Sequence, residues 1–181
     1  QDTLLTWAAR HGQAEAVRLL LEAGASVGAT DGGGRSALCI ACQNGHLECA
    51  QVLRQAGAAI NQANARGATP LYMACQEGRL EIVGLLLEAS AAVNQANARG
   101  ATPLFIACQM GHLECARLLL EAGAAINQAR QDGATPLSIA CYRGHLEVAK
   151  LLSSYGASRA ATPFGTPEEI ATEEGHADLA A

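Results

Sequence analysis

The stretch QANARGATPL occurs twice, at residues 62–71 and 95–104, and a third version, QARQDGATPL, follows at 128–137. Consecutive copies start 33 residues apart. A fixed step of this length is typical of repeat proteins, whose units pack only on their neighbours. We therefore expect a single domain over residues 1–181, built from an incomplete first unit at 1–29, full units at 30–62, 63–95, 96–128 and 129–161, and a partial last unit at 162–181.

Each unit predicts two short helices. In the unit at 63–95, Thr69 can cap a helix whose first position is Pro70, where the missing N–H costs nothing. The apolar segment LYMACQ forms this helix, and LEIVGLLLEA forms a second one that ends near Ser90. Other units have a glycine at the place of Ser90, which suits a left-handed residue after a helix: Gly24, Gly57, Gly123 and Gly156.

Helix pairs of this kind cannot bury their apolar sides alone, so we expect them to stack into an all-α repeat solenoid. The last unit replaces TPLSIAC with TPEEIAT at residues 166–172, which puts Glu and Thr where other units have core residues. We expect this unit either to cap the stack or to mark the boundary of an excised fragment.

The composition disfavours several classes of function. The chain has a formal net charge of −5, whereas a nucleic-acid binder usually has a basic face. No apolar run approaches the roughly 20 residues that a membrane span needs. We expect neither nucleic acid nor a membrane as a partner. The N-terminus lacks a signal-peptide pattern. Because the chain does not begin with Met, we expect a segment of a longer protein.

Seven cysteines are present, and four of them recur at the 33-residue step: Cys42, Cys75, Cys108 and Cys141. Equivalent atoms in stacked helices are roughly 10 Å apart, whereas a disulfide needs Cα atoms within about 7 Å. These thiols therefore cannot pair with their counterparts. We interpret them as small core residues of an intracellular protein in a reducing compartment. The cytoplasm is the expected location, and the nucleus stays open.

The recurring residues resemble the ankyrin repeat. The motif G-x-T-P-L-x-x-A-x-x-x-G-H-L-E…L-L-L-E-A-G-A-x-x-N is clearest from Gly100 to Asn127. The resemblance covers nearly the whole chain in six units. It implies stacked antiparallel helix pairs with projecting β-turn fingers. It also implies a concave surface of first helices and fingertips that binds another protein, and we expect the chain itself to be a monomer.

Two features depart from the family pattern. The Asp of the finger turn is kept only as Asp31 and becomes Asn64, Asn97 and Arg130. Asn can still hydrogen-bond its own turn backbone, but Arg cannot. The family's His after Thr-Pro-Leu is absent, and its place is taken by Cys39, Tyr72, Phe105 and Ser138. We therefore expect weaker hydrogen bonding between neighbouring fingers than the family pattern implies.

One segment has the spacing of a zinc site: Cys39-x2-Cys42-x3-His46-x2-Cys49. Phe105 takes the place of Cys39 in a later unit, so we interpret these residues as packing or capping residues. His46, His112 and His145 follow the glycine between two helices, with no nucleophile or carboxylate repeated beside them as in a catalytic triad. We interpret them as hydrogen-bonding residues. We predict no catalytic, cofactor or metal site, and no enzyme.

Positions that vary between copies while staying exposed are the candidates for partner binding. They comprise finger residues, first-helix ends and two aromatic residues at the inner root of the fingers: Arg35, Arg66, Arg99 and Asp132; Gln76, Glu77, Gln109, Met110, Tyr142 and Arg143; and Tyr72 and Phe105. Arg and large amphipathic side chains are common interface hot spots. We predict a partner with an acidic or polar patch near the fingertips and apolar groups toward Tyr72, Phe105 and Met110.

The charges of the second helices form a separate face. A glutamate recurs there at Glu15, Glu48, Glu81, Glu114 and Glu147, and Arg18, Arg117 and Lys150 follow three residues after theirs. Such pairs stabilise a solvated helix surface only slightly. The net acidity of the chain therefore need not belong to the partner-binding face.

Three alternatives stay open. The array could recruit substrates for an enzyme or adaptor whose catalytic part lies elsewhere. It could also be an engineered or consensus-type scaffold, although seven cysteines and the missing finger aspartates are choices that a designer avoids. Finally, the resemblance implies that Asn61, Asn94 and Asn127 are candidate substrates of an asparaginyl hydroxylase.

Overall fold

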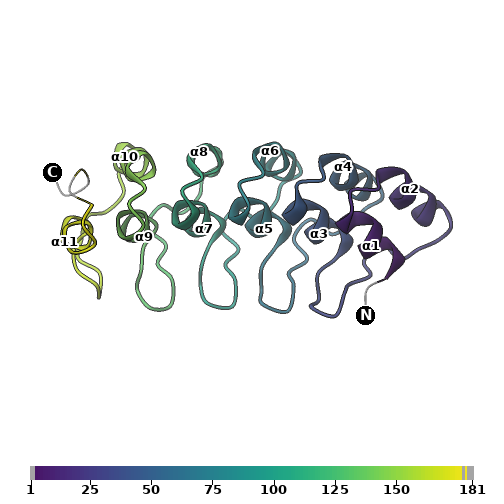
Figure 1. The fold of residues 1–181 in the computed structure, drawn as a ribbon, viewed down its shortest axis with the longest axis horizontal. Coiled ribbons are helices and arrows are strands. Elements are labelled where there is room, and N and C mark those ends of the chain that lie inside the picture. Colours follow the sequence, from purple (N-terminus) through teal and green to yellow (C-terminus); the bar gives the residue numbers. More distant parts are fainter. Residues whose placement is uncertain (1–2, 177, 179–181) are drawn as a thin grey trace. The chain divides into compact units, whose positions relative to one another are not determined.

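The described part of the chain is almost entirely helical. The computed structural model describes residues 3–176 and 178, which form eleven α-helices and, as β-pairing, two isolated bridges, Thr30–Ser36 and Thr162–Gly165. The chain divides into two compact units, residues 1–92 (unit 1) and 93–181 (unit 2). Each unit contains stacked helix pairs with loops that project to one side (Figure 1). The all-α repeat solenoid predicted from the sequence is confirmed.

Unit 1 has two layers of helices. The first layer consists of α1 (Leu4–Arg10), α3 (Ala37–Asn44) and α5 (Pro70–Gln76), packed on one another in that order. The second layer consists of α2 (Ala14–Glu22), α4 (Leu47–Gln55) and α6 (Leu80–Glu88). Each first-layer helix also packs on the second-layer helix that follows it in the chain. Every repeat therefore contributes one helix to each layer.

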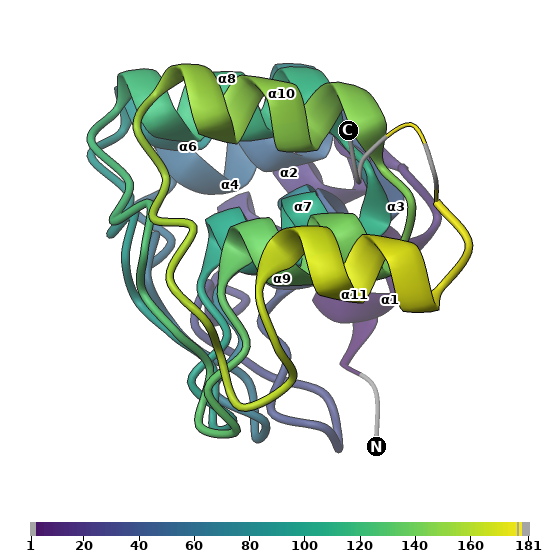
Figure 2. The same ribbon diagram turned by 90° about the vertical axis from the view of Figure 1, so that its left-hand side faces the viewer.

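Unit 2 repeats this arrangement. Its first layer consists of α7 (Pro103–Met110), α9 (Pro136–Tyr142) and α11 (Pro167–Glu173), and its second layer of α8 (Leu113–Glu121) and α10 (Leu146–Ser154). Figure 2 shows α9 and α11 side by side in one layer and α10 in the other. No helix among residues 3–176 and 178 is long and apolar enough to cross a membrane.

The first-layer helices begin as the sequence predicts. The Thr69 hydroxyl accepts a hydrogen bond from the Tyr72 N–H at 3.2 Å, and Pro70 occupies the first helical position. Thr102 and Thr135 cap α7 and α9 in the same way, and the Ser36 hydroxyl caps α3 without a proline. These caps satisfy backbone N–H groups that have no partner inside the helix.

The second-layer helices are followed by a left-handed residue. Its φ is 86° at Gly24, 83° at Gly57 and Gly123, and 80° at Gly156. Ser90 occupies this place after α6 with φ 59°, and it is the one non-glycine residue of positive φ in the described chain. A side chain is disfavoured there because its Cβ crowds the backbone. The backbone at Ser90 is therefore strained at the place where the other repeats have glycine.

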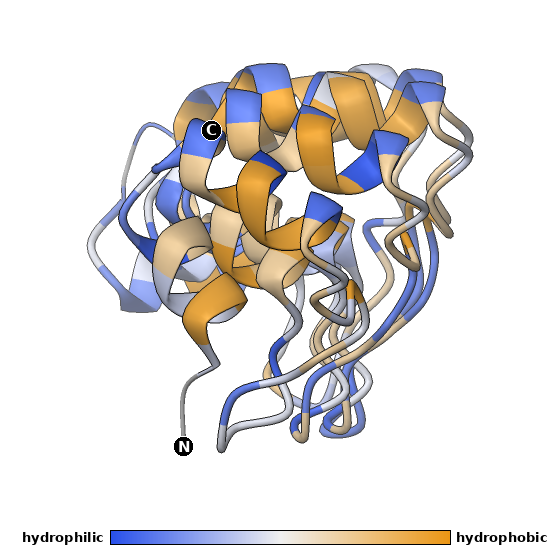
Figure 3. Ribbon diagram, turned by 90° about the vertical axis from the view of Figure 1, so that its right-hand side faces the viewer, coloured by the Kyte–Doolittle hydropathy of each residue, from blue (hydrophilic) through white to orange (hydrophobic). Residues whose placement is uncertain are grey.

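The core lies between the two layers and between successive pairs. Leucine, isoleucine, alanine and cysteine fill it, and the apolar residues concentrate on the helices in Figure 3. All seven cysteines are buried free thiols. Burial raises the pKa of Cys39 to about 12 and those of Cys115 and Cys141 to about 11. The predicted role of the thiols as core residues is confirmed.

Candidate partner-binding site

The fingers are tight turns that side chains hold from within. In the second finger, residues 64–68, the Asn64 Oδ1 accepts hydrogen bonds from the N–H groups of Arg66 at 2.9 Å and Ala68 at 3.1 Å. Asn97 does the same in the third finger, residues 97–101. Adjacent fingers also bond directly within each unit, from the Ala65 N–H to the Gly33 carbonyl at 3.1 Å in unit 1. The loss of the family's Asp therefore leaves these turns internally bonded.

In the fourth finger, residues 130–134, a different residue accepts the hydrogen bond from the turn backbone. Asp132 forms a close ion pair with Arg130, and its Oδ1 accepts a hydrogen bond from the Ala134 N–H at 3.2 Å. The hydrogen bond from Arg130 lowers the pKa of Asp132 to about 2. The Arg130 guanidinium carbon also lies 5.0 Å from the centroid of the Phe105 ring. Arg130 thus joins the finger to the helix of the preceding repeat.

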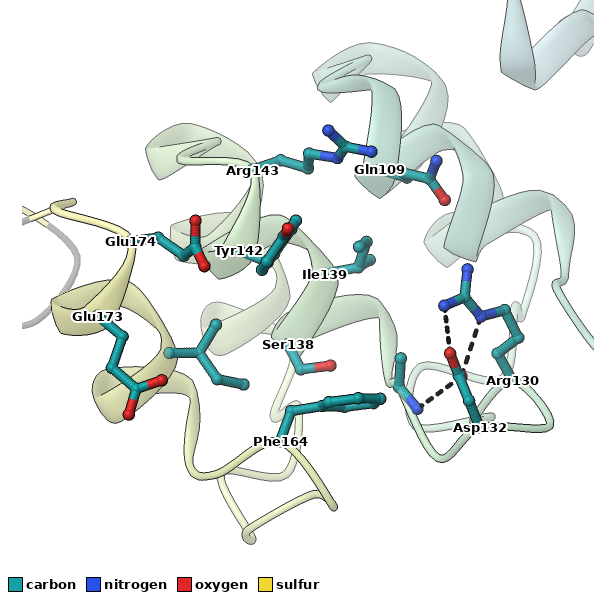
Figure 4. Close-up of a pocket in the computed structure, with 12 residues that line it drawn as sticks. Gln109, Arg130, Asp132, Ser138, Ile139, Tyr142, Arg143, Phe164, Glu173 and Glu174 are labelled. Atoms are coloured by element: carbon teal, nitrogen blue, oxygen red, sulfur yellow. Dashed lines mark hydrogen bonds and ion pairs between the residues drawn. The ribbon is translucent and has the colours of Figure 1, made fainter.

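A pocket of about 460 Å³ opens in unit 2 between this finger, α9 and α11. Its lining residues are shown in Figure 4: Gln109, Arg130, Asp132, Ala134, Ser138, Ile139, Tyr142, Arg143, Phe164, Ile170, Glu173 and Glu174. Ile139 and Ile170 are buried and give it an apolar floor. Tyr142 and Phe164 are 46% and 54% exposed, so their rings stand at the edge of the pocket in contact with solvent.

The rim of this pocket is charged unevenly. Figure 4 shows Glu173, the last residue of α11, and Glu174 directly after it at one side, and the Arg130–Asp132 ion pair at the other. The Arg143 guanidinium carbon lies 5.6 Å from the centroid of the Tyr142 ring, within the range of a cation–π contact. The Arg130 charge is compensated by Asp132, whereas Glu173 and Glu174 are exposed. The pocket is therefore apolar at its floor, acidic at the α11 side and basic near Arg143.

Histidines at the start of second-layer helices connect consecutive repeats. The His46 Nε2 hydrogen-bonds the Arg10 carbonyl at 3.0 Å, and the His145 Nε2 hydrogen-bonds the Gln109 carbonyl at 3.2 Å. These contacts confirm the interpretation of His46 and His145 as hydrogen-bonding residues. No group of three or more His, Cys, Asp or Glu side chains with the geometry of a metal site occurs within residues 3–176 and 178.

Comparison with known proteins agrees with this architecture. A family model described as ankyrin repeats in three copies matches residues 1–64, 56–130 and 89–162. The chain belongs to the ankyrin-repeat family. Ankyrin repeats are generally non-catalytic modules of protein–protein interaction. No curated protein matches the chain as a relative.

Within this ankyrin-repeat chain, the pocket brings four predicted residues together: Gln109, Asp132, Tyr142 and Arg143. Met110 is 46% exposed at the end of α7, but it does not line the pocket. Arg66, Glu77 and Arg99 are exposed, the two arginines at the fingers and Glu77 at the end of α5. These residues stay candidates for contact with a partner.

The structure places other predicted residues differently. Tyr72 is 7% exposed and Phe105 fully buried, because the third residue of α5 and of α7 points into the core of the ankyrin stack. Their side chains are therefore not available to a partner. Arg35 is occupied within its own repeat, where it pairs with Asp31 of the finger at 2.7 Å and donates to Gln43 of α3 at 3.2 Å. The Gln76 amide donates to Glu77 at 3.0 Å.

The prediction missed Phe164, Glu173 and Glu174, together with the apolar floor of the pocket. Phe164 is one of two phenylalanines in the chain, and it lies in the short last finger, residues 162–165. A large aromatic residue in a turn of otherwise small and polar residues was a signal that could have been used. The sequence indicates a cap or a fragment boundary for the last ankyrin repeat, and neither interpretation points to Phe164.

Proposed function

We propose that this chain is a non-catalytic protein-binding module and that its partner inserts a large apolar side chain into the pocket of unit 2. The observation that carries the proposal is the pair of exposed aromatic rings, Tyr142 and Phe164, over a floor made by Ile139 and Ile170. Exposed aromatic residues beside an apolar hollow are the kind of site where a few contacts supply most of the binding energy.

The repeat itself supports a functional origin for Tyr142. Its equivalents in the three preceding full repeats are Gln43, Gln76 and Gln109, so the fold does not need an aromatic residue at this place. Tyrosine has few rotatable bonds and combines apolar area with a hydroxyl, which makes it effective in interfaces. A hollow that is preformed by stacked helices also loses little conformational entropy when it binds.

The charges around the pocket describe the partner further. Glu173 and Glu174 favour a basic residue on one side of the inserted apolar side chain, and Arg143 favours an acidic or polar residue on the other. The exposed Arg66 and Arg99 favour acidic groups near the fingertips, as the sequence predicts. The partner that fits is thus a protein segment with one large apolar residue between groups of opposite charge.

The cellular setting belongs to the same proposal. Seven buried free thiols are compatible with a reducing compartment, so we assign the chain to a larger intracellular protein in which it presents this surface.

Selection from a displayed peptide library tests the binding site directly. The intact chain is the target, and each selected peptide is then measured against a Tyr142→Gln, Phe164→Ala double variant. Tyr142→Gln installs the residue that other repeats already have, so folding is preserved. We expect selected peptides to share a large apolar residue and to lose at least about tenfold in affinity for the double variant.

Two further variants sharpen the result. Tyr155→Ala is the matched control, because Tyr155 is 44% exposed but lies at the end of α10, away from the pocket. Reversal of Glu173 and Glu174 to Lys is expected to change the selected sequences from basic to acidic flanks. Peptides that bind the Tyr142→Gln, Phe164→Ala variant as tightly as the parent protein would show that the pocket is not the binding site.

A further inference from the structure

The first helix pair exposes apolar side chains on the side that faces away from the next pair. Leu4 and Trp7 of α1 are 74% and 52% exposed, and Leu19 of α2 is 56% exposed. We call these three residues the leading face. Figure 3 views unit 1 from this end, and the helices nearest the viewer carry orange, apolar segments. By contrast, Leu5, Ala8 and Ala9 of α1 are buried, so α1 is packed on one side only.

The residues equivalent to the leading face are buried in the next repeat, where they are Ala37, Ile40 and Val52, whereas Leu85, at the place of Leu19 in α6, is half-buried. Ile40 and Met73 occupy the place of Trp7 in α3 and α5 and are 1% and 7% exposed. Val52 occupies the place of Leu19 in α4 and is 8% exposed. In unit 1, α3 packs on α1, α5 on α3, and α4 on α2. In each case, the preceding helix pair therefore buries the residue.

The last repeat has the opposite chemistry on its outward side. At the positions where α9 has Leu137 and Cys141, α11 has Glu168 and Thr172. Glu168 forms an ion pair with Arg159 at 3.0 Å, and Thr172 is exposed. A polar outward face is what a terminal repeat of a stack requires. The leading face of α1 and α2 keeps the apolar side chains Leu4, Trp7 and Leu19, and an exposed polar neighbour is His11, whose ring centroid lies 4.4 Å from that of Trp7.

The N-terminal cap of α1 is also of the kind found in internal repeats. Thr3 caps α1 by accepting a hydrogen bond from the Thr6 N–H at 3.2 Å, as Thr69 caps α5. Thr69 is reached from the preceding helix pair through the finger at 64–68. The same connection ahead of Thr3 would bring a helix pair directly onto Leu4, Trp7 and Leu19.

We propose that the leading face is the docking site of one more ankyrin-type helix pair, carried by the same polypeptide ahead of Thr3. The interface continues the one already present between α1 and α3 and between α2 and α4. It is distinct from the pocket of unit 2, so the two proposals stand or fall separately.

A copy of the chain's own repeat serves as the probe. Residues 36–68 are placed directly ahead of Thr3, so that Ala68 precedes Thr3 as it precedes Thr69 in the parent protein. This segment has no tryptophan, and Trp7 is the single tryptophan of the chain. Its fluorescence therefore reports on the leading face alone. We expect a blue-shifted emission, a several-fold fall in acrylamide quenching and a higher thermal midpoint.

Two controls accompany this measurement. A glycine–serine segment of equal length ahead of Thr3 is expected to leave the emission and the acrylamide quenching of Trp7 unchanged from the parent protein. The double change Leu4→Lys, Leu19→Lys is expected to alter the thermal midpoint little in the parent protein, because both side chains are exposed there. In the extended protein it should lower the midpoint clearly, since the two lysines would then be buried.

Three results would overturn the proposal. One is a Trp7 that stays as accessible in the extended protein as in the parent, although circular dichroism shows the added helices. Another is a parent protein that buries Trp7 as its concentration rises and sediments as a dimer, which would make a second copy the occupant. The third is a transcript whose reading frame ahead of residue 1 encodes no such helix pair.

Discussion

The Asp31 carboxylate is held by Arg35 through two contacts to the same oxygen, at 2.7 Å from Nη2 and 2.8 Å from Nε. Its other oxygen accepts hydrogen bonds at 2.9 Å from the N–H groups of Gly33 and Arg35. Burial alone would raise the pKa of Asp31, but the hydrogen bonds and charge of Arg35 lower it below its ordinary value. The first finger is thus fastened by a buried charge, where the second and third use a neutral asparagine.

Replacing Asp31 by Asn tests the contribution of this charge. Asn can keep the two backbone hydrogen bonds, as Asn64 does in its own finger, but it loses the ion pair with Arg35 and a second one with Arg10 at 3.4 Å. We expect about 1–2 kcal/mol less free energy of unfolding near neutral pH, a value moderated by the partial exposure of Arg35.

The pH dependence of this change has a definite sign. Because the folded pKa of Asp31 is lowered, its stabilisation is present above the ordinary value of 3.8 and is lost as the pH falls through the folded pKa. Urea unfolding of the parent and the Asp31→Asn protein should therefore differ near neutral pH and converge in acid. A difference that is the same in acid would show that the charge contributes nothing.

A substitution at Ser90 should stabilise the protein. Ser90 has φ 59°, where the equivalent repeats have glycine. Ser90→Gly removes the strain of a side chain in the left-handed region, and we expect about 1 kcal/mol more free energy of unfolding. The reverse change, Gly57→Ser, should cost a similar amount. Denaturant titrations of both variants measure the effect, and a destabilised Ser90→Gly protein would contradict it.

Gly111 is expected to tolerate a side chain less well than Gly123. Both have positive φ, 77° and 83°, so alanine is strained at either place. A Cβ on Gly111 would also lie 2.6 Å from the His145 ring, whereas nothing lies within 4 Å of one on Gly123. Moving the ring breaks its hydrogen bond to Gln109. Gly123→Ala should cost about 1 kcal/mol, and Gly111→Ala about 1 kcal/mol more.

The double variant Gly111→Ala, His145→Ala separates the two causes. Without the ring, the additional loss at Gly111 should disappear, so the two changes will be non-additive in a double-mutant cycle. Strict additivity would mean that the ring does not restrict this position.

The cysteines should resist alkylation in the folded protein. All seven are buried, and burial raises the pKa of Cys39 to about 12 and those of Cys115 and Cys141 to about 11. The reactive thiolate is therefore scarce at mildly alkaline pH, and reagent access is blocked as well. Iodoacetamide followed by mass spectrometry should show almost no labelling until urea is added. A cysteine that is labelled rapidly in the native protein would identify a repeat that opens locally.

The helices and their ends were predictable because they depend on capping and turn residues close in sequence, and the same residues recur in each repeat. Thr69 and Pro70 begin α5 through interactions within one turn, and the left-handed residue after α6 follows from the glycines at equivalent places. Such features do not depend on the packing of distant residues. Repetition also gave several independent examples of each rule.

The site was predictable only in part, because exposure depends on packing between repeats. Tyr72 and Phe105 replace a polar residue of the family, but the position itself is covered, in the case of Phe105 by Arg130 of the next finger. Phe164 lies in a finger whose spacing to the next Thr-Pro differs from that of the other repeats. A comparison at the fixed step therefore gave no equivalent for it.

The contact between a glycine and the ring of the next repeat has a consequence for the gene. Gly12 faces His46, Gly111 faces His145 and Gly45 faces the Arg79 side chain, so a repeat carries the glycine of the contact to its successor and the side chain of the contact to its predecessor. A segment of 33 codons can be duplicated or deleted at any phase and the halves still meet. A segment of any other length separates them. Recombination between the two verbatim copies of QANARGATPL removes or adds one such block, so the array can change length in a single genetic event without a new interface having to evolve.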